Sequence, residues 1–241
     1  MGVLFDLHGT KRYNIRKASI LLGVLVLLTC TVLLSARDPL RAVWNEDMGS
    51  VLVIDPGHGG IDGGAIAADG TRESGINLAI ALRMQALAEL FGQRYIMTRT
   101  EDVTLSDMQK YSEHEDLAER ARIASETPGA VLVSIHQNCY IAPQPHGAQT
   151  LYADDEESRR LGTMIHDSLN KYLDPENRRL AEPAPKKLFL TSNADCPAVL
   201  VECGFMSNPN DLSKLKSSGY QTALAAVMLT AFLQYDSDHS T

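Results

Sequence analysis

Positive charge is in short supply in this 241-residue sequence, which has 22 lysines and arginines against 30 aspartates and glutamates and a net charge of −8 at pH 7. A protein whose main partner is nucleic acid needs a basic face for the phosphates. The composition therefore argues against nucleic acid as a partner. The sequence also contains no internal repeat and no low-complexity tract, and its length suits one α/β domain with a core plus an appendage.

Cysteine is scarce as well, with four residues and no C-x-x-C motif. Cys30 lies in an apolar run near the N-terminus. The remaining three, Cys139, Cys196 and Cys203, are an odd number, so at least one is unpaired within the chain. We expect buried free thiols, and a bridge between Cys196 and Cys203 is the alternative.

An uncharged apolar run, Ala18–Ser35, follows four basic residues within positions 1–17. A helix of roughly 17–18 apolar residues is about the minimum that crosses a bilayer. Because the basic flank precedes the run, we expect a cytoplasmic segment at 1–17, a transmembrane anchor at 18–35 and an extracytoplasmic remainder at the cell membrane. A cleaved signal peptide, giving a secreted form, is the alternative. Residues 36–50 are polar and predict a linker.

Strands and helices alternate from Val51 to Tyr235, and residues 236–241 are expected to be a tail. The apolar runs predict strands at 51–54, 95–98, 131–135, 148–152 and 199–201. Helical periodicity predicts helices at 73–91, within 105–125, at 156–172 and at 220–232, and the proline-rich, charged stretch 174–187 predicts an exposed loop. This alternation is typical of a single α/β domain with a mostly parallel central sheet and helices on both faces.

Polar side chains follow three of these predicted strands directly. His58 comes after the turn Asp55-Pro56-Gly57, His136 follows the third strand and Glu202 follows the fifth. The carboxyl ends of parallel strands meet at one edge of the sheet, where α/β proteins build their sites. We therefore expect the two imidazoles and the carboxylate to lie close together.

A second carboxylate, Glu73, opens the first long helix close in sequence to His58. Taken alone it would be a helix N-terminal charge that favours the helix dipole. Two imidazoles and one carboxylate are a common ligand set for catalytic zinc, and a carboxylate that is not a ligand can act as general base on the bound water. The other histidines, which we expect at the surface, are His8, His114, His146, His166 and His239.

Seven segments along the chain carry a resemblance to a known family. They are VIDPGHGGIDGGA, RESGINLAIAL, MTRTED, LAERARIA, SIHQN, GAQTLY and PAVLVECGFMSNPND. In this order they resemble the zinc-dependent N-acetylmuramoyl-L-alanine amidases (amidase type 3), and the resemblance covers 51–235. The apolar N-terminal run, the compact domain and GAQTLY are most similar to the membrane-anchored, CwlD-like sporulation and germination group.

The resemblance implies that His58, Glu73 and His136 bind Zn²⁺ and that Glu202 is the catalytic acid and base. It implies hydrolysis of the amide between the lactyl group of N-acetylmuramic acid and L-alanine in peptidoglycan. The residues flanking Glu73, and the Gln-Asn-Cys segment after His136, depart from the common pattern but remove no ligand.

The resemblance also implies a setting, namely spore cortex maturation with formation of muramic-δ-lactam. A vegetative autolysin with the same chemistry, a non-catalytic peptidoglycan-binding regulator and a zinc peptidase or deacetylase are the alternatives. The partners expected are peptidoglycan, the membrane through the N-terminal anchor, and a regulatory protein whose identity the sequence does not give.

Overall fold

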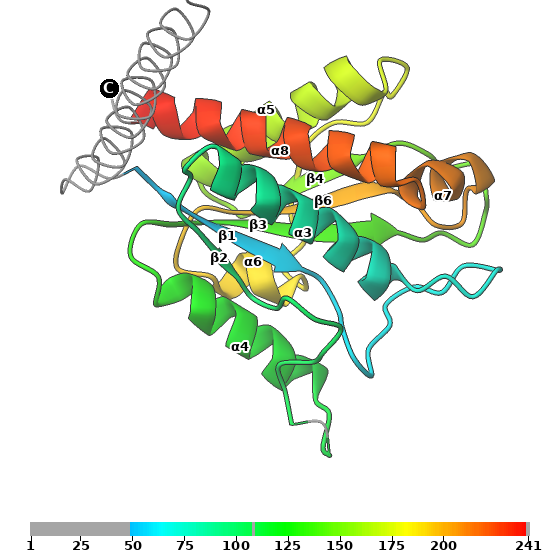
Figure 1. Cartoon of the computed structure of the whole chain (residues 1–241), viewed down its shortest axis with the longest axis horizontal. Coiled ribbons are helices and arrows are strands. Elements are labelled where there is room, and N and C mark those ends of the chain that lie inside the picture. The colour runs from blue at the N-terminus through cyan, green and yellow to red at the C-terminus, as the bar shows by residue number, and fades with distance from the viewer. Residues whose placement is uncertain (1–48, 108, 240–241) are drawn as a thin grey trace, which may run out of the picture. The chain divides into compact units, whose positions relative to one another are not determined.

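The computed structural model describes residues 49–107 and 109–239. A six-stranded sheet lies at the centre of this domain, with the strand order β2-β1-β3-β6-β4-β5 (Figure 1). The strands are β1 (Val51–Pro56), β2 (Tyr95–Met97), β3 (Ala130–Asn138), β4 (Gln149–Tyr152), β5 (Glu182–Pro183) and β6 (Ala198–Phe205). The β1 residues are all buried, as expected for a continuous apolar run in the middle of a sheet.

The sheet is mixed, although most of its pairings are parallel. Strand β1 pairs in parallel with β2 and β3, and β3 pairs in parallel with β6. Strand β4 runs antiparallel to β6, and the short β5 runs parallel to β4. The segment between β3 and β4 contains no helix. The chain therefore enters β4 from the edge at which it left β3, and this sets the antiparallel direction of β4.

Strand order reverses at β1. The chain passes from β1 through a helix to β2 on one side, and β3 lies on the other side of β1. In α/β sheets the crevice outside the carboxyl ends of strands at such a reversal is the usual place for a ligand. Two predicted site residues lie here, because His58 follows β1 and His136 lies near the carboxyl end of β3.

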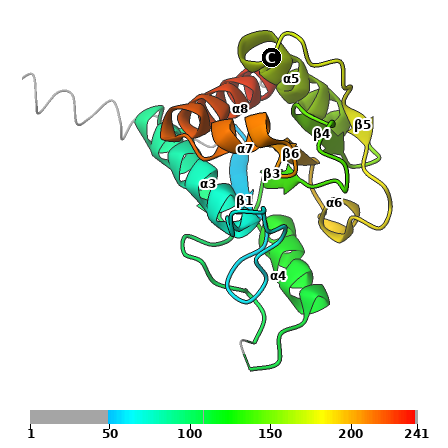
Figure 2. The same ribbon diagram turned by 90° about the vertical axis from the view of Figure 1, so that its right-hand side faces the viewer.

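Helices cover both faces of the sheet, as predicted from the sequence (Figures 1 and 2). Helices α3 (Glu73–Leu90), α5 (Glu156–Leu173) and α8 (Ser218–His239) pack on one face. Helices α4 (Glu113–Ser125) and α6 (Phe189–Asn193) pack on the other. Alternate strand residues serve the two cores: Leu52 and Val133 face α3 and α8, whereas Val53 and Leu132 face α4 and α6.

Three strands are longer than the sequence predicted. Strand β1 continues through Asp55 and Pro56, which were expected to lie in the turn. Strand β3 continues to Asn138 and β6 continues to Phe205, so His136 and Glu202 lie within strands rather than after them. The two residues are direct partners in the parallel β3–β6 pairing. The hydrogen-bonded pairing of β3 with β6 therefore continues beyond the last apolar residue of each predicted strand.

Other departures from the predicted elements are local. Helix α4 begins only at Glu113, because Ser112 caps it by accepting a hydrogen bond from the Glu115 backbone N–H. Helices α6 and α7 (Pro209–Leu215) were not predicted from the sequence. The stretch 174–187, predicted as an exposed loop, contains β5 and the buried Asn177.

The ends of the domain also differ from the predicted limits. Helix α8 continues to His239, so residues 236–239 are helical rather than a tail. The Ser50 backbone N–H donates to Asp236 over 2.7 Å, which ties the last residue of the predicted linker to this helix.

Within the described residues, no helix is both long and apolar enough to span a bilayer. The predicted anchor at 18–35 lies outside the described residues. Cys139, Cys196 and Cys203 are free thiols, so the alternative of a Cys196–Cys203 bridge is wrong. Cys139 is exposed, however, rather than buried as expected.

Candidate metal centre and cleft

His58 stands on a sharp turn just beyond β1. Its φ angle is +61°, in the left-handed region that residues other than glycine seldom adopt. Its Nδ1 lies 2.7 Å from Asp62 Oδ2, and its Nε2 lies 3.3 Å from Glu73 Oε1. The ring is thus held from one side by a carboxylate and points its other nitrogen at Glu73.

Glu73 is the first residue of α3 and is buried, with 3% of its surface exposed. Its Oε2 accepts a hydrogen bond from the Ala65 backbone N–H over 2.9 Å. Its Oε1 accepts one from the Gln137 backbone N–H over 3.0 Å and another from Asn77 Nδ2 over 3.3 Å. Glu73 does stand in the first turn of α3, as expected for a helix N-terminal charge, but its carboxylate is also buried and hydrogen bonded.

His136 completes a three-residue cluster. Its Nδ1 lies 3.1 Å from Glu73 Oε1, and its ring meets the His58 ring edge to face with centroids 4.9 Å apart. One nitrogen from each imidazole and one Glu73 oxygen all lie within 4.8 Å of one another. The structure therefore brings together the three residues that the sequence nominated as metal ligands.

The charges in this cluster suit a cation. Burial favours neutral Glu73, but hydrogen bonds from His136 and His58 outweigh it and hold the pKa of Glu73 far below its usual value. Burial also disfavours charged His58, yet its hydrogen bonds to Asp62 and Glu73 raise its pKa to about 10. A divalent metal bound by the two imidazoles would replace the protons that this carboxylate now attracts.

Two glycines make room for the side chains of the cluster. A Cβ placed on Gly57 would lie 2.2 Å from the His136 ring. A Cβ on Gly64 would lie 2.6 Å from both Glu73 Oε2 and the His58 ring, and Gly64 also has a φ of +62°. The glycine-rich loop after β1 is therefore shaped around the imidazoles and the carboxylate.

Glu202 stands beside His136 on the next strand, and alternation along β6 points its side chain to the α4 and α6 face. Its Oε2 is inaccessible to solvent and has no hydrogen-bond partner among the described residues. Burial, reinforced by the nearby Glu73 carboxylate, raises the pKa of Glu202 to about 7 although His136 acts in the opposite direction. This carboxylate can take up and release a proton near neutral pH.

A buried ion network supports the His58 turn from below, and the sequence analysis missed it. Arg120 of α4, only 1% exposed, donates to Asp55 over 2.6 Å and to Asp116 over 2.6 Å. It also donates to the backbone oxygens of Pro56 and His58 over 2.9 and 2.8 Å. The segment LAERARIA supplied this arginine, but nothing in its spacing shows that α4 turns it towards β1.

Arg99 supports the same turn from its other side. It donates to the backbone oxygens of Pro56 and Gly57 and to that of Ser74, over 2.9 to 3.1 Å. Ser74 follows Glu73, so one buried guanidinium links the chain segments that carry two residues of the cluster.

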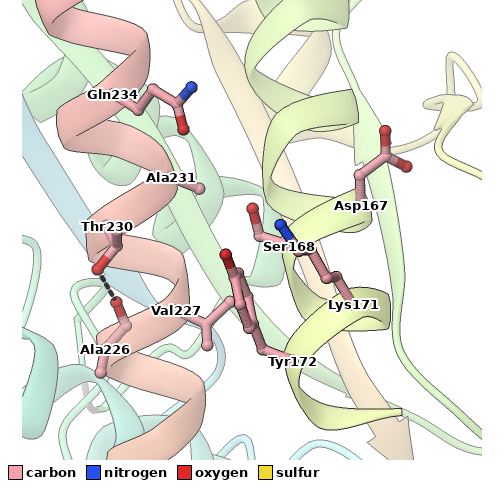
Figure 3. A pocket seen from close by; sticks show the side chains of 9 residues that line it. All are labelled: Asp167, Ser168, Lys171, Tyr172, Ala226, Val227, Thr230, Ala231 and Gln234. Carbon is pink, nitrogen blue, oxygen red and sulfur yellow. Dashed lines mark hydrogen bonds between the residues drawn. The ribbon is translucent and has the colours of Figure 1, made fainter. Parts of the chain in front are cut away.

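A cleft of about 230 Å³ opens beside the cluster, between α4 and α6. Its lining includes His58, His136, Glu202, Tyr111 and Lys187. A second hollow, of about 370 Å³, lies between α5 and α8 (Figure 3). Its lining includes Asp167, Lys171 and alanine, valine and hydroxyl side chains but no histidine, so the chemistry points to the cleft at the cluster.

One other histidine is not where the sequence placed it. His166 was expected at the surface but is 1% exposed, and its Nε2 lies 2.8 Å from the Arg179 backbone oxygen. It lies on the inward face of α5 and ties the 174–187 stretch to that helix.

Comparisons with known proteins agree with this geometry. A family model described as N-acetylmuramoyl-L-alanine amidase matches residues 52–234. The germination-specific N-acetylmuramoyl-L-alanine amidase of Bacillus subtilis is 29% identical over 230 residues, which cover 93% of this chain and 96% of the relative.

A solved structure extends the comparison. The CwlD amidase of Clostridioides difficile, solved in complex with the GerS lipoprotein, is 34% identical with a TM-score of 0.74. The match covers 78% of this chain and 98% of that one. Together with the family model, it shows that this chain belongs to the N-acetylmuramoyl-L-alanine amidase family, in its CwlD-like group, and is an amidase that acts on peptidoglycan.

Proposed function

We propose that this amidase is zinc-dependent, with His58, Glu73 and His136 holding the ion and Glu202 acting as acid and base. The observation that carries the proposal is the convergence of two imidazole nitrogens and one carboxylate oxygen within 4.8 Å, one strand away from Glu202. A set of two histidines and one carboxylate is typical of catalytic zinc and leaves a position for water. Bound zinc supplies Lewis acidity that polarises a carbonyl and makes water a better nucleophile.

Glu202 then has two tasks. It accepts a proton from the water that attacks the lactyl carbonyl, and it delivers that proton to the amine of L-alanine as the C–N bond breaks. The products are a lactyl carboxylate on the glycan and a free stem peptide. A pKa near 7 suits a group that must serve as base and then as acid at neutral pH.

Incubation of purified muropeptides with the full chain, followed by mass spectrometry, tests this proposal. We expect free stem peptides that begin with L-alanine. Glu202→Gln should retain bound zinc and lose about 10²–10⁴-fold in rate. His58→Ala should lose zinc by elemental analysis, and an undiminished zinc content in that variant would contradict the ligand assignment.

Other products would identify the alternative functions. Cleavage within the peptide would indicate a zinc peptidase, and loss of acetyl groups would indicate a deacetylase. No change in the muropeptides, with binding retained, would indicate a regulator that holds peptidoglycan without cutting it. Substantial turnover by a folded Glu202→Gln protein would remove Glu202 from the mechanism.

For the biological setting, we propose maturation of the spore cortex with formation of muramic-δ-lactam. The similarity to a germination-specific amidase and to CwlD supports this setting over a vegetative autolysin. Deletion in the producing organism should give spores whose cortex lacks muramic-δ-lactam, as measured by muropeptide analysis. A normal cortex together with altered vegetative wall turnover would favour the autolysin.

We also propose a membrane-anchored enzyme with an extracytoplasmic catalytic domain and a lipoprotein partner. The basic residues before the apolar run 18–35 support the orientation, and the GerS complex of a 34% identical relative supports the partner. Protease accessibility in spheroplasts tests the orientation, and the mass of the mature chain distinguishes an anchor from a cleaved signal. Co-purification from sporulating cells tests the partner.

A further inference from the structure

Resting on the proposed amidase function, we propose that Arg179, fixed by Gln149, binds a carboxylate of the stem peptide beside Glu202. The structure places this guanidinium at the end of a row of polar side chains that begins at the metal centre. It would select substrates in which the acidic residue after L-alanine, D-glutamate in common stem peptides, keeps its free α-carboxylate.

The row follows from the strand register. His136 is the direct partner of Glu202 in the β3–β6 pairing, and Glu202 is the direct partner of Gln149 in the β6–β4 pairing. Direct partners on neighbouring strands project from the same face of the sheet, and neighbouring strands are about 4.8 Å apart. Gln149 therefore extends the catalytic face by one strand, away from the metal centre.

Arg179 is held firmly at the end of this row. Its Nη1 donates to Gln149 Oε1 over 2.7 Å, and its Nε donates to the His146 backbone oxygen over 3.3 Å. Its guanidinium carbon lies 4.6 Å from the centroid of the Phe205 ring. These contacts fix the plane of the guanidinium before any ligand arrives, which reduces the entropy lost on binding.

The same guanidinium still has donors to offer. Arg179 is partly exposed, and its Nη2 makes no hydrogen bond to the described residues. The buried Arg99 and Arg120 differ, because they are hydrogen bonded to protein oxygens at the His58 turn. Arg179 is thus suited to a carboxylate, which the planar fork of an arginine recognises well.

The chemistry of the substrate indicates which part would bind here. The sugars of the glycan strand offer hydroxyl and acetamido groups, whereas the stem peptide carries carboxylates. One extended residue spans about 3.3–3.6 Å, so the α-carboxylate of the second residue lies within reach of the strand next to Glu202. In a chain with a net charge of −8, an anionic peptide needs a local cation of this kind.

The test compares two matched muropeptides that differ in one group, the free α-carboxylate of D-glutamate or its amide. We expect the wild-type, zinc-loaded protein to prefer the carboxylate in kcat/KM by about tenfold or more, the size of one charge-assisted hydrogen bond. Arg179→Gln should reduce this ratio to about one, and Arg179→Lys should leave an intermediate ratio. Arg178→Gln removes the adjacent exposed guanidinium, which among the described residues contacts only Pro175, Glu176 and Asn177, and should leave the ratio unchanged.

The ratio separates substrate recognition from an indirect effect on Glu202. If Arg179 only influenced Glu202 or supported its loop, Arg179→Gln would slow both substrates equally and the ratio would persist, which would overturn the proposal. Equal rates of the wild-type protein on both substrates would overturn it too. Circular dichroism and zinc content confirm that each variant is folded and loaded.

A binding measurement keeps the proposal separate from the proposed function. Calorimetry with the free peptides L-Ala-D-Glu and L-Ala-D-isoglutamine needs no turnover. The wild-type protein should bind the first more tightly, and Arg179→Gln should abolish the difference even if the amidase assay fails. Equal affinity of the wild-type protein for both peptides would overturn the subsite irrespective of the catalytic result.

Discussion

The two sides of the metal centre are built on opposite principles. On the β1 side, the His58 turn rests on Arg99 and Arg120, and both guanidinium groups donate hydrogen bonds to its backbone oxygens. On the β6 side, Glu202 keeps a buried oxygen without a partner. The difference teaches that buried guanidinium groups fix the backbone that carries His58, whereas the carboxylate that we propose as the proton-transfer group keeps one oxygen unsatisfied.

The largest effect is expected on the β1 side, from Arg120→Met. The change leaves the buried Asp55 carboxylate without its cation, and breaking a buried pair from one side costs about 3–5 kcal/mol. Denaturant unfolding measures the loss. Arg122→Met, two residues along α4, breaks only exposed pairs with Glu119 and Glu126 and should reduce the free energy of unfolding far less. Equal losses of unfolding free energy in the two variants would show that the buried pairs stabilise the fold no more than the exposed pairs do.

On the β6 side we expect a substitution, Glu202→Gln, to raise the free energy of unfolding rather than to lower it. Burial raises the pKa of Glu202 from 4.5 to about 7, so the native state opposes its ionisation. In metal-free wild-type protein this lowers stability as the pH rises from 4.5 through 7, by up to about 3 kcal/mol. Glu202→Gln removes the effect.

The measurement is the free energy of unfolding of both proteins in EDTA between pH 4.5 and 8. The variant should match the wild type at pH 4.5 and exceed it at pH 8. A variant less stable than the wild type at pH 8 would contradict the idea of an unsatisfied carboxylate. On the β1 side, the lowered pKa values of Asp55 and Asp116 mean that their contribution is lost only as the pH falls below about 4.

A smaller effect is expected from Gly57→Ala, which adds one methyl group 2.2 Å from the His136 ring. The ring must move, and we expect zinc affinity to fall about 10–100-fold, as for other disturbances of ligand orientation. Competition with a chromophoric chelator gives the affinity. Gly75→Ala is the matched control, because a Cβ there meets nothing within 4 Å and sits in helix α3. Unchanged zinc affinity in Gly57→Ala would mean that the turn can rearrange to accept the methyl group without displacing the His136 ring.

The smallest effects are expected from the groups behind His58. Asp62→Asn weakens the 2.7 Å contact to His58 Nδ1 and should reduce zinc affinity by about tenfold. Tyr111→Phe removes a hydrogen bond to Asp62, one step further away, and should have the lesser effect. A larger loss of zinc affinity in Tyr111→Phe than in Asp62→Asn would contradict the prediction that the group in direct contact with His58 has the greater effect.

Much of the fold could be predicted because its signals are local. The apolar run at β1 and the helical period of α3 are visible in the sequence, and both elements lie where they were expected. The five-residue α6 and the two-residue β5 were missed because such short elements depend on tertiary contacts rather than on periodicity.

The candidate site was predictable to the same limited extent. Strand ends brought His58, His136 and Glu202 to one edge, and the cluster of His58, His136 and Glu73 is confirmed as geometry. Their roles in catalysis stay predictions. Arg120 and Arg179 could not be foreseen, because their contacts join residues 62 and 30 positions away and no spacing rule reports such pairs.

The parallel pairing of β1 with β3 has a consequence for how the enzyme matures. Glu73 and His136 are 63 positions apart, and the pairing of β1 with β3 and the packing of α3 on β3 bring their segments together. Pairings between distant segments form slowly and carry most of the loop-closure cost of folding. Under the proposed zinc mechanism, metal binding therefore follows assembly of the whole sheet, and the enzyme gains its hydrolytic activity only at that point.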